Sequence, residues 1–379
     1  MIKRAGCWKS SQSRISRDRP RRSPTSEESE QPPMQRVLIV GLGLIGSSIG
    51  LALRRWSEER KVDGRKPLEV IGFDPNLDHQ RAAEKLGAVD KGAWDLAKAA
   101  READVVVLAT PVNSMREVMQ DLAPQLRPGT IVADTGSTKA QVLTWAREIL
   151  PQGVHFIGTH PMAGKTQSVE GSDADLFVGA TWCVSPSVTA SEEAVRTVLG
   201  LVSAAGAEPF FIDPEEHDAY VAGVSHLPFV MSAALMNAVS RDASWRDMKT
   251  LTAGGFRDTT RLAAGSPAMH RDILLTNREA VIRWIDAVVG TLGEIRQSIA
   301  SADESASAPL DAFFSEARDA RAEWATQTTR EGELLQGTAA ELNPESVSDH
   351  MGRMFLGGFA KRLRTPPKRG DSSPPAPSR

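Results

Sequence analysis

The sequence predicts an α/β protein in which a Rossmann-like, doubly wound, mostly parallel sheet is followed by an all-α helical domain. Short apolar runs alternate with helical patterns from residue 36 to residue 212, as they do in doubly wound sheets. A glycine-rich motif follows the first apolar run, where this fold turns from strand to helix. From residue 214 to residue 335 no convincing strand pattern occurs, and long helical patterns take its place.

Each strand is predicted from an apolar run that ends at a glycine, a proline or a polar residue. The predicted strands cover residues 36–40, 68–73, 104–109, 130–134, 155–158, 181–185 and 208–212. The helices between them are predicted at residues 45–56, 80–86, 115–126, 139–149 and 191–205. Further helices are predicted at residues 215–240, 266–301 and 310–335, with a break at 306–309.

These patterns divide the 379 residues into four parts. We expect a disordered basic tail at residues 1–33, a sheet domain at 34–213, a helical domain at 214–340 and a flexible tail at 341–379. The first part is rich in Arg, Ser and Pro and has almost no apolar side chains, so it cannot bury enough surface to fold. An organellar transit peptide and a true start at Met34 are the alternatives.

The composition is that of a globular protein, with 41% hydrophobic and 25% charged residues. A formal net charge of -3 gives no indication of a nucleic-acid surface. No apolar run approaches the roughly 20 residues that span a bilayer, so no membrane partner is expected. Cys7 and Cys183 cannot build a disulfide framework, and neither has metal-ligand spacing. We therefore expect no metal site, a cytoplasmic location and a buried Cys183.

The turn after the first predicted strand has the G-x-G-x-x-G spacing of a dinucleotide-binding site. The first glycine permits the tight turn, the second lets the backbone approach a pyrophosphate, and the third lets the helix pack on the strand. The N–H groups at the helix N-terminus then bind the phosphate charge. We predict that the whole motif binds the cofactor: Gly41, Leu42, Gly43, Leu44, Ile45 and Gly46.

Asp74 follows the second predicted strand, where an acidic residue accepts the adenosine ribose hydroxyls and repels a 2′-phosphate. It is 28 residues after Gly46, longer than the usual spacing of about 20, because a charged stretch lengthens the connection. NAD is therefore the predicted cofactor. Arg54, Arg55 and Arg81 keep NADP as an alternative, since a nearby arginine could bind a 2′-phosphate.

Later segments leave the sheet at the same carboxyl edge, where ligands bind in such folds. Thr110 and Pro111 follow the third strand and are predicted to line the cofactor path. Ser137 follows the fourth strand, and His160 lies in a small-residue turn, residues 158–164, after the fifth. A histidine with a pKa near neutrality can accept a proton from an alcohol as hydride leaves its carbon. We predict that His160 is the catalytic base and that Ser137 orients it.

Two segments of the predicted helical domain also contain polar side chains suited to a ligand. Ser225 and His226 stand just before Pro228, which bends a helix and frees a backbone carbonyl. Arg261 lies in a segment that begins with a glycine pair at residues 254–255, and arginine is the natural bidentate partner of a carboxylate. From chemistry alone, a cap or a surface ion pair explains each segment as well as substrate binding does.

Taken together, these motifs resemble the prephenate/arogenate dehydrogenase family over about residues 34–335. The segment His160-Pro-Met-Ala-Gly164, following Asp134-Thr-Gly-Ser-Thr-Lys139, is the most specific part of the resemblance. The family has a Rossmann domain, here residues 34–213, which binds NAD(P). A helical domain that forms a homodimer follows it, here residues 214–340. The resemblance implies the oxidative decarboxylation of prephenate to 4-hydroxyphenylpyruvate in tyrosine biosynthesis, or of arogenate to tyrosine.

The resemblance also implies roles for single residues. The histidine matching His160 binds the ring hydroxyl of the substrate, and the serine matching Ser137 supports that contact. The residues matching His226 and Arg261 lie in the substrate pocket, where the arginine holds a carboxylate. Some prephenate-using members have Thr-Glu after the histidine motif, whereas this chain has Lys-Thr-Gln at 165–167, which is closer to arogenate-using members.

Two other functions are alternatives. A β-hydroxyacid dehydrogenase usually relies on a lysine in its helical domain, and Lys249 lacks the surrounding pattern of that family. A nucleotide-binding sensor without turnover would not need Ser137, His160, His226 and Arg261 together. An NAD-dependent prephenate dehydrogenase is therefore the favoured function, with arogenate as the alternative substrate.

Overall fold

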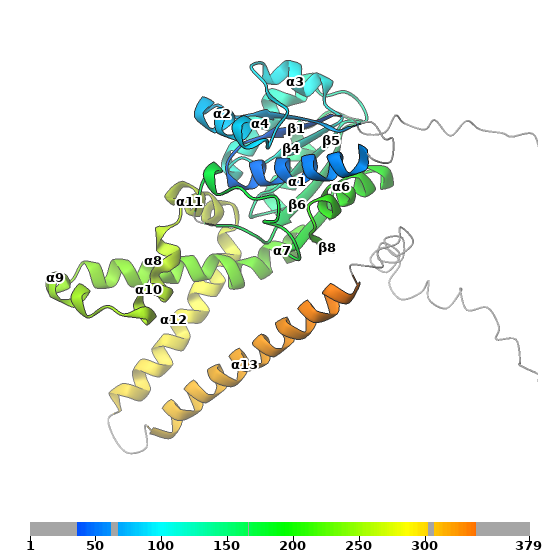
Figure 1. Ribbon diagram of the computed structural model, residues 1–379. Helices are drawn as coiled ribbons and strands as arrows, with labels where there is room; N and C mark the ends of the chain where they lie inside the picture. Colours follow the sequence, from blue (N-terminus) through cyan, green and yellow to red (C-terminus); the bar gives the residue numbers. More distant parts are fainter. Residues whose placement is uncertain (1–35, 62–66, 166, 302–306, 339–379) are drawn as a thin grey trace, which may run out of the picture. The chain divides into compact units, whose positions relative to one another are not determined.

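The computed structural model describes residues 36–61, 67–165, 167–301 and 307–338 (Figure 1). The predictions for the two ends of the chain, at 1–33 (with the alternative start at Met34) and at 341–379, lie outside the described residues. The described chain forms a mostly parallel sheet with helices on both faces and then continues as helices. This arrangement confirms the predicted fold class.

The sheet has eight strands in the order β3-β2-β1-β4-β5-β6-β7-β8. All neighbouring strands are parallel except β6 and β7, which pair antiparallel. The strands are β1 (Arg36–Val40), β2 (Glu69–Phe73), β3 (Lys91–Gly92), β4 (Val105–Leu108), β5 (Ile131–Asp134), β6 (His155–Pro161), β7 (Thr181–Pro186) and β8 (Glu208–Phe211). Strand order reverses direction at β1 and β4, so the crevice at their carboxyl ends is where a dinucleotide binds in this fold.

Two apolar layers hold the sheet between helices. Successive side chains of a strand point to opposite faces, and in β1 Val37 and Ile39 belong to one layer whereas Leu38 and Val40 belong to the other. Side chains of α1, α2 and α6 complete the first layer, and those of α3, α4 and α5 complete the second. These helices are α1 (Leu44–Lys61), α2 (Leu77–Leu86), α3 (Leu96–Glu102), α4 (Val112–Leu122), α5 (Ala140–Ile149) and α6 (Glu192–Ala204), with 3₁₀ turns η1 (Ala123–Gln125) and η2 (Val169–Gly171).

After β8 every described element is helical. The elements are α7 (Pro214–Val221), a π-helical turn η3 (Ala222–His226), α8 (Leu227–Ser240), α9 (Trp245–Met248), η4 (Lys249–Leu251), α10 (Gly254–Thr260), η5 (Arg261–Ala264), α11 (Pro267–Thr276), α12 (Arg278–Ala300) and α13 (Ser307–Thr338). The continuous helix predicted at 266–301 is wrong, because the chain breaks at Asn277, whose backbone is not helical. The short elements β3, α3, α9 and α10 were not predicted, since each is too brief to show a clear period.

The helical stretch Pro214–Ser240 is long and apolar enough to cross a membrane by length and composition alone, with a mean hydropathy of 1.4 over its most apolar window. The sequence prediction that no such stretch exists is therefore wrong. The stretch is not uniformly apolar, however. His217, Asp218 and His226 lie in it with their side chains buried against the rest of the protein. Buried polar side chains of this kind indicate a site within the fold.

Candidate active site

The glycine motif forms a tight connection between β1 and α1. Gly41 has a φ of 98°, and a Cβ there would lie 2.5 Å from the Ala109 carbonyl oxygen. A Cβ on Gly46 would lie 1.9 Å from the Gly41 carbonyl oxygen, so larger residues do not fit there. A Cβ on Gly43, by contrast, would meet no atom within 4 Å among the described residues. The open space beside Gly43, at the N-terminus of α1, fits a pyrophosphate.

The non-glycine residues of the motif anchor it to the sheet. Leu42 is fully buried, Leu44 is 8% exposed, and Ile45 packs against the same apolar layer. Their side chains therefore do not take part in polar contacts with a cofactor. What they offer is the position of their backbone N–H groups at the start of α1.

Asp74 lies just after β2, beside the glycine motif. One carboxylate oxygen, Oδ2, accepts a 2.8 Å hydrogen bond from the Leu42 N–H, and Oδ1 accepts one of 2.8 Å from the Asn76 N–H. A carboxylate has about four acceptor sites, so two remain for ribose hydroxyls. His79 lies 3.5 Å from Oδ2. This geometry fits an unphosphorylated adenosine ribose, as in NAD.

The arginines that favoured the NADP alternative pair with other side chains. Arg54 forms an ion pair with Asp90 at 3.1 Å, and Arg55 pairs with Asp175. Both lie about ten residues into α1, roughly 15 Å along the helix from its N-terminus. Arg81 lies 3.6 Å from the Asp78 carboxylate. None of the three is in contact with Asp74 in the described structure.

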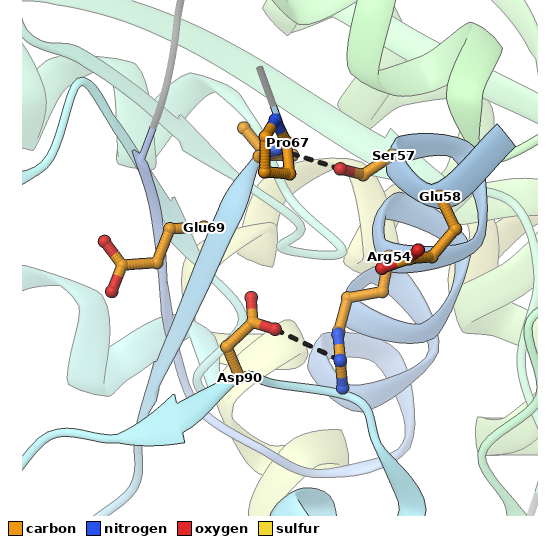
Figure 2. A pocket seen from close by; sticks show the side chains of 7 residues that line it. Arg54, Ser57, Glu58, Pro67, Glu69 and Asp90 are labelled. Carbon is orange, nitrogen blue, oxygen red and sulfur yellow. Dashed lines mark hydrogen bonds and ion pairs between the residues drawn. The ribbon is translucent and has the colours of Figure 1, made fainter. Parts of the chain in front are cut away.

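Figure 2 shows where Arg54 lies. It lines a surface cleft of about 230 Å³ together with Ser57, Glu58, Pro67, Leu68, Glu69 and Asp90. The Arg54–Asp90 ion pair closes one side, and the Ser57 hydroxyl accepts a 2.8 Å hydrogen bond from the Leu68 N–H. The cleft lies at the amino end of β2, whereas the glycine motif lies at the carboxyl end of β1. It is therefore separate from the candidate active site.

Thr110 and Pro111 lie between β4 and α4. The Thr110 hydroxyl oxygen is buried and has no hydrogen-bond partner among the described residues. Pro111 is the N-cap residue of α4 and is exposed. An unpaired hydroxyl at the carboxyl edge of β4 is available to a ligand in the crevice, because buried polar groups are normally paired.

A buried ion pair holds the loop that contains Ser137 against the strand that contains His160. Lys139 is fully buried, and its Nζ donates to the Asp134 carboxylate and, at 2.7 Å, to the Thr159 carbonyl oxygen. The same carboxylate accepts from the Gly136 N–H at 2.7 Å and from the Thr159 N–H at 3.0 Å. Asp134 and Lys139 thus fix the loop that contains Ser137 against the strand that contains His160.

The prediction that His160 lies in the turn after the fifth strand is wrong. In the structure His160 lies within β6. The strand continues to Pro161, because His160 pairs with Cys183 of the antiparallel strand β7. Its side chain is 8% exposed. Burial lowers the pKa of His160 well below its usual value, and His217 lowers it further. Cys183 is buried, as predicted, and burial raises the pKa of its thiol.

His160 is joined to a second histidine that the sequence analysis missed. The Nδ1 atom of His160 lies 2.9 Å from Nε2 of His217, and the two rings meet edge-on at 71°. Nδ1 of His217 lies 2.8 Å from Oδ1 of Asp218. Asp218 also accepts hydrogen bonds from the Lys139 and Ala140 N–H groups, at 2.7 and 3.0 Å, at the start of α5.

His226 lies in the same cluster. In an uninterrupted α-helix it would lie on the face opposite His217, nine residues earlier, about 180° away. The π-helical turn η3 changes that rotation, and such turns are frequent at functional sites. The Asn277 amide nitrogen donates to the Asp218 carbonyl oxygen at 2.7 Å and lies 3.2 Å from Nδ1 of His226. Asn277 therefore joins His226 to the helix that contains Asp218.

The contact with Asn277 determines the tautomer of His226. Because the amide nitrogen of Asn277 donates, Nδ1 of His226 accepts and the proton lies on Nε2. His226 is fully buried, and its Nε2 has no hydrogen-bond partner among the described residues. Burial lowers the pKa of His226 to about 4, and Asp218 and the nearby Ser137 backbone raise it only in part. The Nε2–H thus has the Ser137 backbone close by but makes no hydrogen bond of ordinary geometry, so it is a donor for a substrate oxygen.

The other predicted site residues have no side-chain hydrogen bond to the histidine cluster among the described residues. Ser137 is half-buried, and its backbone lies near His226. Ser225 is half-buried in η3, next to His226. Arg261 is exposed at the start of η5, which packs on α8, and no hydrogen bond or ion pair joins it to the histidine cluster within the described residues. The structure therefore brings together His160, Ser137 and His226, and leaves Arg261 outside this contact network.

Two further polar contacts join the helical segment to the sheet domain. Asn113, at the start of α4, donates a 2.8 Å hydrogen bond to the buried Asp272 of α11, and Thr138 lies 2.9 Å from Thr276. Among the described residues no group of three or more His, Cys, Asp or Glu side chains is arranged to hold a metal ion.

The low pKa of His226 predicts an acid-labile fold. The unfolded chain binds a proton near pH 6.5, whereas folded His226 binds it only near pH 4, because burial lowers its pKa. Between these values the unfolded state holds more protons, so stability falls as the pH falls. The contribution is about 3 kcal/mol over the whole window. Urea unfolding at several pH values should show a weaker pH dependence for His226→Gln than for the wild type, and an unchanged dependence would contradict the prediction.

Comparison with known proteins shows which family the chain resembles. Residues 49–210 match the family model described as prephenate dehydrogenase, nucleotide-binding domain, and residues 213–311 match that described as prephenate dehydrogenase, dimerization domain. The chain is 33% identical to prephenate dehydrogenase of Bacillus subtilis over 288 residues, which is 75% of each chain.

Solved structures agree with these matches. Prephenate dehydrogenase of Aquifex aeolicus, crystallised with hydroxyphenyl propionate and NAD+, has a TM-score of 0.70 and 31% identity. The alignment covers 78% of this chain and 99% of that one. Arogenate dehydrogenase of Synechocystis has a TM-score of 0.63 and 26% identity, over 76% of this chain and 100% of that one. From its sequence, its fold and these relatives, the chain belongs to the prephenate/arogenate dehydrogenase family.

Proposed function

We propose that this chain catalyses the NAD-dependent oxidative decarboxylation of prephenate to 4-hydroxyphenylpyruvate, a step in tyrosine biosynthesis. The observation that supports it most directly is the buried His160 imidazole, bonded through Nδ1 at the same sheet edge as the dinucleotide motif. The relatives named above catalyse this reaction or that of arogenate. The Aquifex aeolicus relative binds NAD+ with a hydroxyphenyl ligand, which has the ring of the expected product.

The reaction balances with one base and one hydride acceptor. When bound, NAD+ accepts the hydride from the carbinol carbon of the cyclohexadienol ring. His160 accepts the hydroxyl proton at Nε2, since Nδ1 is engaged with His217. The ring carboxylate then leaves as CO2, its bonding electrons complete the aromatic ring, and protonated His160 returns its proton to the phenolate oxygen, which gives 4-hydroxyphenylpyruvate. Aromatisation supplies the driving force, so the protein needs mainly to orient the substrate and accept the proton.

The second histidine has a different role in this proposal. The unpaired Nε2–H of His226 is a donor and not a base, because its Nδ1 already accepts from Asn277. It suits a substrate carboxylate or carbonyl oxygen. The Ser137 hydroxyl is proposed to hold the substrate hydroxyl toward His160, which the nearness of the Ser137 backbone to His226 supports. Ser225, next to His226 in η3, is proposed to bind substrate as well.

We propose that residues 34–213 bind NAD and that residues 214–340 supply the rest of the substrate site. Binding of NAD rests on Gly41, Gly43 and Gly46 at the start of α1, and on Asp74 beside them. Thr110 and Pro111 extend the path toward the nicotinamide.

The Arg261 side chain is proposed to hold a substrate carboxylate. Replacing it by alanine removes a charge-assisted hydrogen bond, so KM for the substrate should rise roughly 10- to 100-fold while kcat changes little. The matched control is Arg257→Ala, which removes another exposed arginine one helical turn earlier. Steady-state kinetics of both variants decide the point. Equal KM values for the two variants would remove Arg261 from the substrate site.

The reaction is tested with purified full-length protein. NADH formation is followed by absorbance with prephenate, with arogenate and with 3-hydroxyisobutyrate, and CO2 release is measured alongside. We expect equal amounts of NADH and CO2 with prephenate. Reaction with 3-hydroxyisobutyrate alone would indicate a β-hydroxyacid dehydrogenase, and no reaction with any substrate would indicate a sensor.

Arogenate is the second candidate substrate. It is favoured by the similarity to arogenate dehydrogenase of Synechocystis and by Lys165 and Gln167 after the histidine motif. The ratio of kcat/KM for the two substrates on the same protein distinguishes them. A higher value for arogenate would make it the physiological substrate without changing the roles of His160 and NAD.

We propose that the chain is a homodimer formed through residues 214–340 and located in the cytoplasm. The matching family model is described as a dimerization domain. Large apolar side chains of the helical segment are exposed in the single chain: Val224, Leu251, Val289, Ile299, Phe314 and Trp324. A second copy would bury such a surface. Light scattering after size-exclusion chromatography measures the assembled mass, and a monomer at micromolar concentration would contradict the dimer.

A further inference from the structure

The chain of contacts behind His160 has a direction that the hydrogen-bonding capacities fix. The Asp218 carboxylate accepts two hydrogen bonds at the start of α5, from the Lys139 and Ala140 N–H groups. An ionised carboxylate only accepts. The remaining partner of Oδ1, Nδ1 of His217 at 2.8 Å, must therefore donate. In neutral His217 the other nitrogen, Nε2, is then an acceptor.

The same reasoning continues to His160. Because Nε2 of His217 accepts, the Nδ1 atom of His160, 2.9 Å away, carries the proton. The lone pair of His160 is then on Nε2, the nitrogen that points away from His217. That is the tautomer a base needs if it is to take the proton of a substrate hydroxyl.

We propose that Asp218, acting through His217, is the positioning residue that fixes the tautomer and the ring orientation of His160. This inference rests on the function proposed above for His160. In this proposal neither Asp218 nor His217 touches the reacting atoms. Both act through His160. The arrangement has the logic of a carboxylate–histidine pair in a hydrolase triad, with one further imidazole inserted.

The site of Asp218 suits this role. Its carboxylate lies at the N-terminus of α5, a ten-residue helix, where the helix dipole and two N–H groups stabilise a negative charge. It is buried and comes from α7, whereas α5 follows the loop that contains Ser137. One carboxylate thus ties the helical segment, the Ser137 loop and the His160 tautomer to one another.

The decisive variant is Asp218→Leu. Asparagine does not serve, because Oδ1 accepts from both the Lys139 N–H and Nδ1 of His217, so an amide oxygen stays at that position and keeps the tautomer. Leucine is close to aspartate in size and has no acceptor, so nothing then holds the proton of His217 on Nδ1 or leaves Nε2 of His160 free as a base. We expect kcat to fall by roughly 10²-fold.

A pair of substitutions at His217 separates positioning from packing. Glutamine places its amide oxygen where Nε2 of His217 stands, so His217→Gln can still accept from His160. Asparagine reaches only as far as Nδ1, so His217→Asn keeps the contact with Asp218 and leaves His160 without a partner. We expect His217→Gln to retain kcat within roughly tenfold of wild type and His217→Asn to fall as Asp218→Leu does.

The control for losing a buried carboxylate between the helical segment and the sheet is Asp272→Leu. Asp272 is 3% exposed, accepts from Asn113 and pairs with Arg271, and within the described residues it makes no hydrogen bond to the histidine chain. We expect it to lower Tm as much as Asp218→Leu does while kcat stays close to wild type. A fall in kcat for Asp272→Leu as large as for Asp218→Leu would assign the effect to packing and overturn the proposal.

The tautomer is read directly by NMR on full-length protein labelled with ¹⁵N-histidine. The His160 signals are assigned by their loss in His160→Asn. We expect the proton on Nδ1 in the wild type and a large share of it on Nε2 in Asp218→Leu. The same tautomer in both proteins, or equal kcat for His217→Gln and His217→Asn, would overturn the proposal. The spectra need no substrate, so they remain decisive if prephenate and arogenate are not turned over.

Discussion

His160→Asn should lower kcat by roughly 10²- to 10⁴-fold, the usual contribution of a general base, while NAD affinity and Tm stay close to wild type. Asparagine can place its amide nitrogen where Nδ1 of His160 stands and can donate to His217 as the imidazole does. It has no atom in the place of Nε2. The substitution therefore keeps the contact behind the ring and removes only the nitrogen that faces the substrate.

Steady-state kinetics and fluorescence titration with NAD measure the two effects separately. The control is His155→Asn, which replaces a histidine at the other end of the same strand, five residues or roughly 17 Å away. It should leave kcat near the wild-type value. Retention of near-normal kcat by His160→Asn, with the control equally active, would show that another group takes the proton.

Lys139→Met should destabilise the protein by about 3–5 kcal/mol, because it leaves the Asp134 carboxylate buried without its cation. Both side chains are fully buried, and Lys139 also donates to the Thr159 carbonyl oxygen next to His160. The free energy of unfolding in urea gives the loss of stability. We also expect a fall in kcat at temperatures where the variant is folded, since the Ser137 loop loses its bond to β6.

Two further variants test the origin of that loss. Lys165→Met breaks an ion pair with Asp173 in which the two side chains are 42% and 46% exposed. It should lower the free energy of unfolding by at most about 1 kcal/mol. The double variant Asp134→Asn/Lys139→Met removes both charges and should be less destabilised than the sum of the single variants. Additive losses, or a cost at Lys165 as large as that at Lys139, would mean that the buried pair has no special role.

Much of the sheet was predictable because its signals are local. A strand buried on both faces is a short apolar run, and β1, β4 and β5 are such runs with every or nearly every residue buried. The glycine spacing 41–46 reports a turn that larger residues cannot make, as the clashes at Gly41 and Gly46 confirm. These features depend on residues close in sequence, so the sequence alone predicts them.

The support of the site was not predictable in the same way. His217 and Asp218 stand in a helix whose start is marked by Asp213 and Pro214, and nothing in their spacing indicates a ligand or a base. Their role depends on the packing of α7 against the start of α5, a contact between residues 79 apart in sequence. The available signal was weak: an adjacent His-Asp pair just before the apolar residues of α8.

The break at Asn277 was missed for a related reason. The periodic pattern continues through it, and the sequence therefore predicted one helix. In the structure the side chain of Asn277 bonds the Asp218 carbonyl oxygen and Nδ1 of His226, contacts that the chain direction after α11 makes possible. The sequence also leaves open whether Arg54 and Arg55 could reach a 2′-phosphate, because their distance from Asp74 depends on the fold. In the structure they pair with Asp90 and Asp175.

The central claim is that Nε2 of His160 faces the hydroxyl of the substrate ring beside bound NAD. A crystal structure of the full-length protein with NAD+ and 4-hydroxyphenylpyruvate measures this directly. We predict that the phenolic oxygen lies within hydrogen-bond distance of Nε2, about 2.6–3.2 Å, with Nδ1 still bonded to His217. A hydroxyl bound to another group, with the His160 ring turned away from the ligand, would contradict the account.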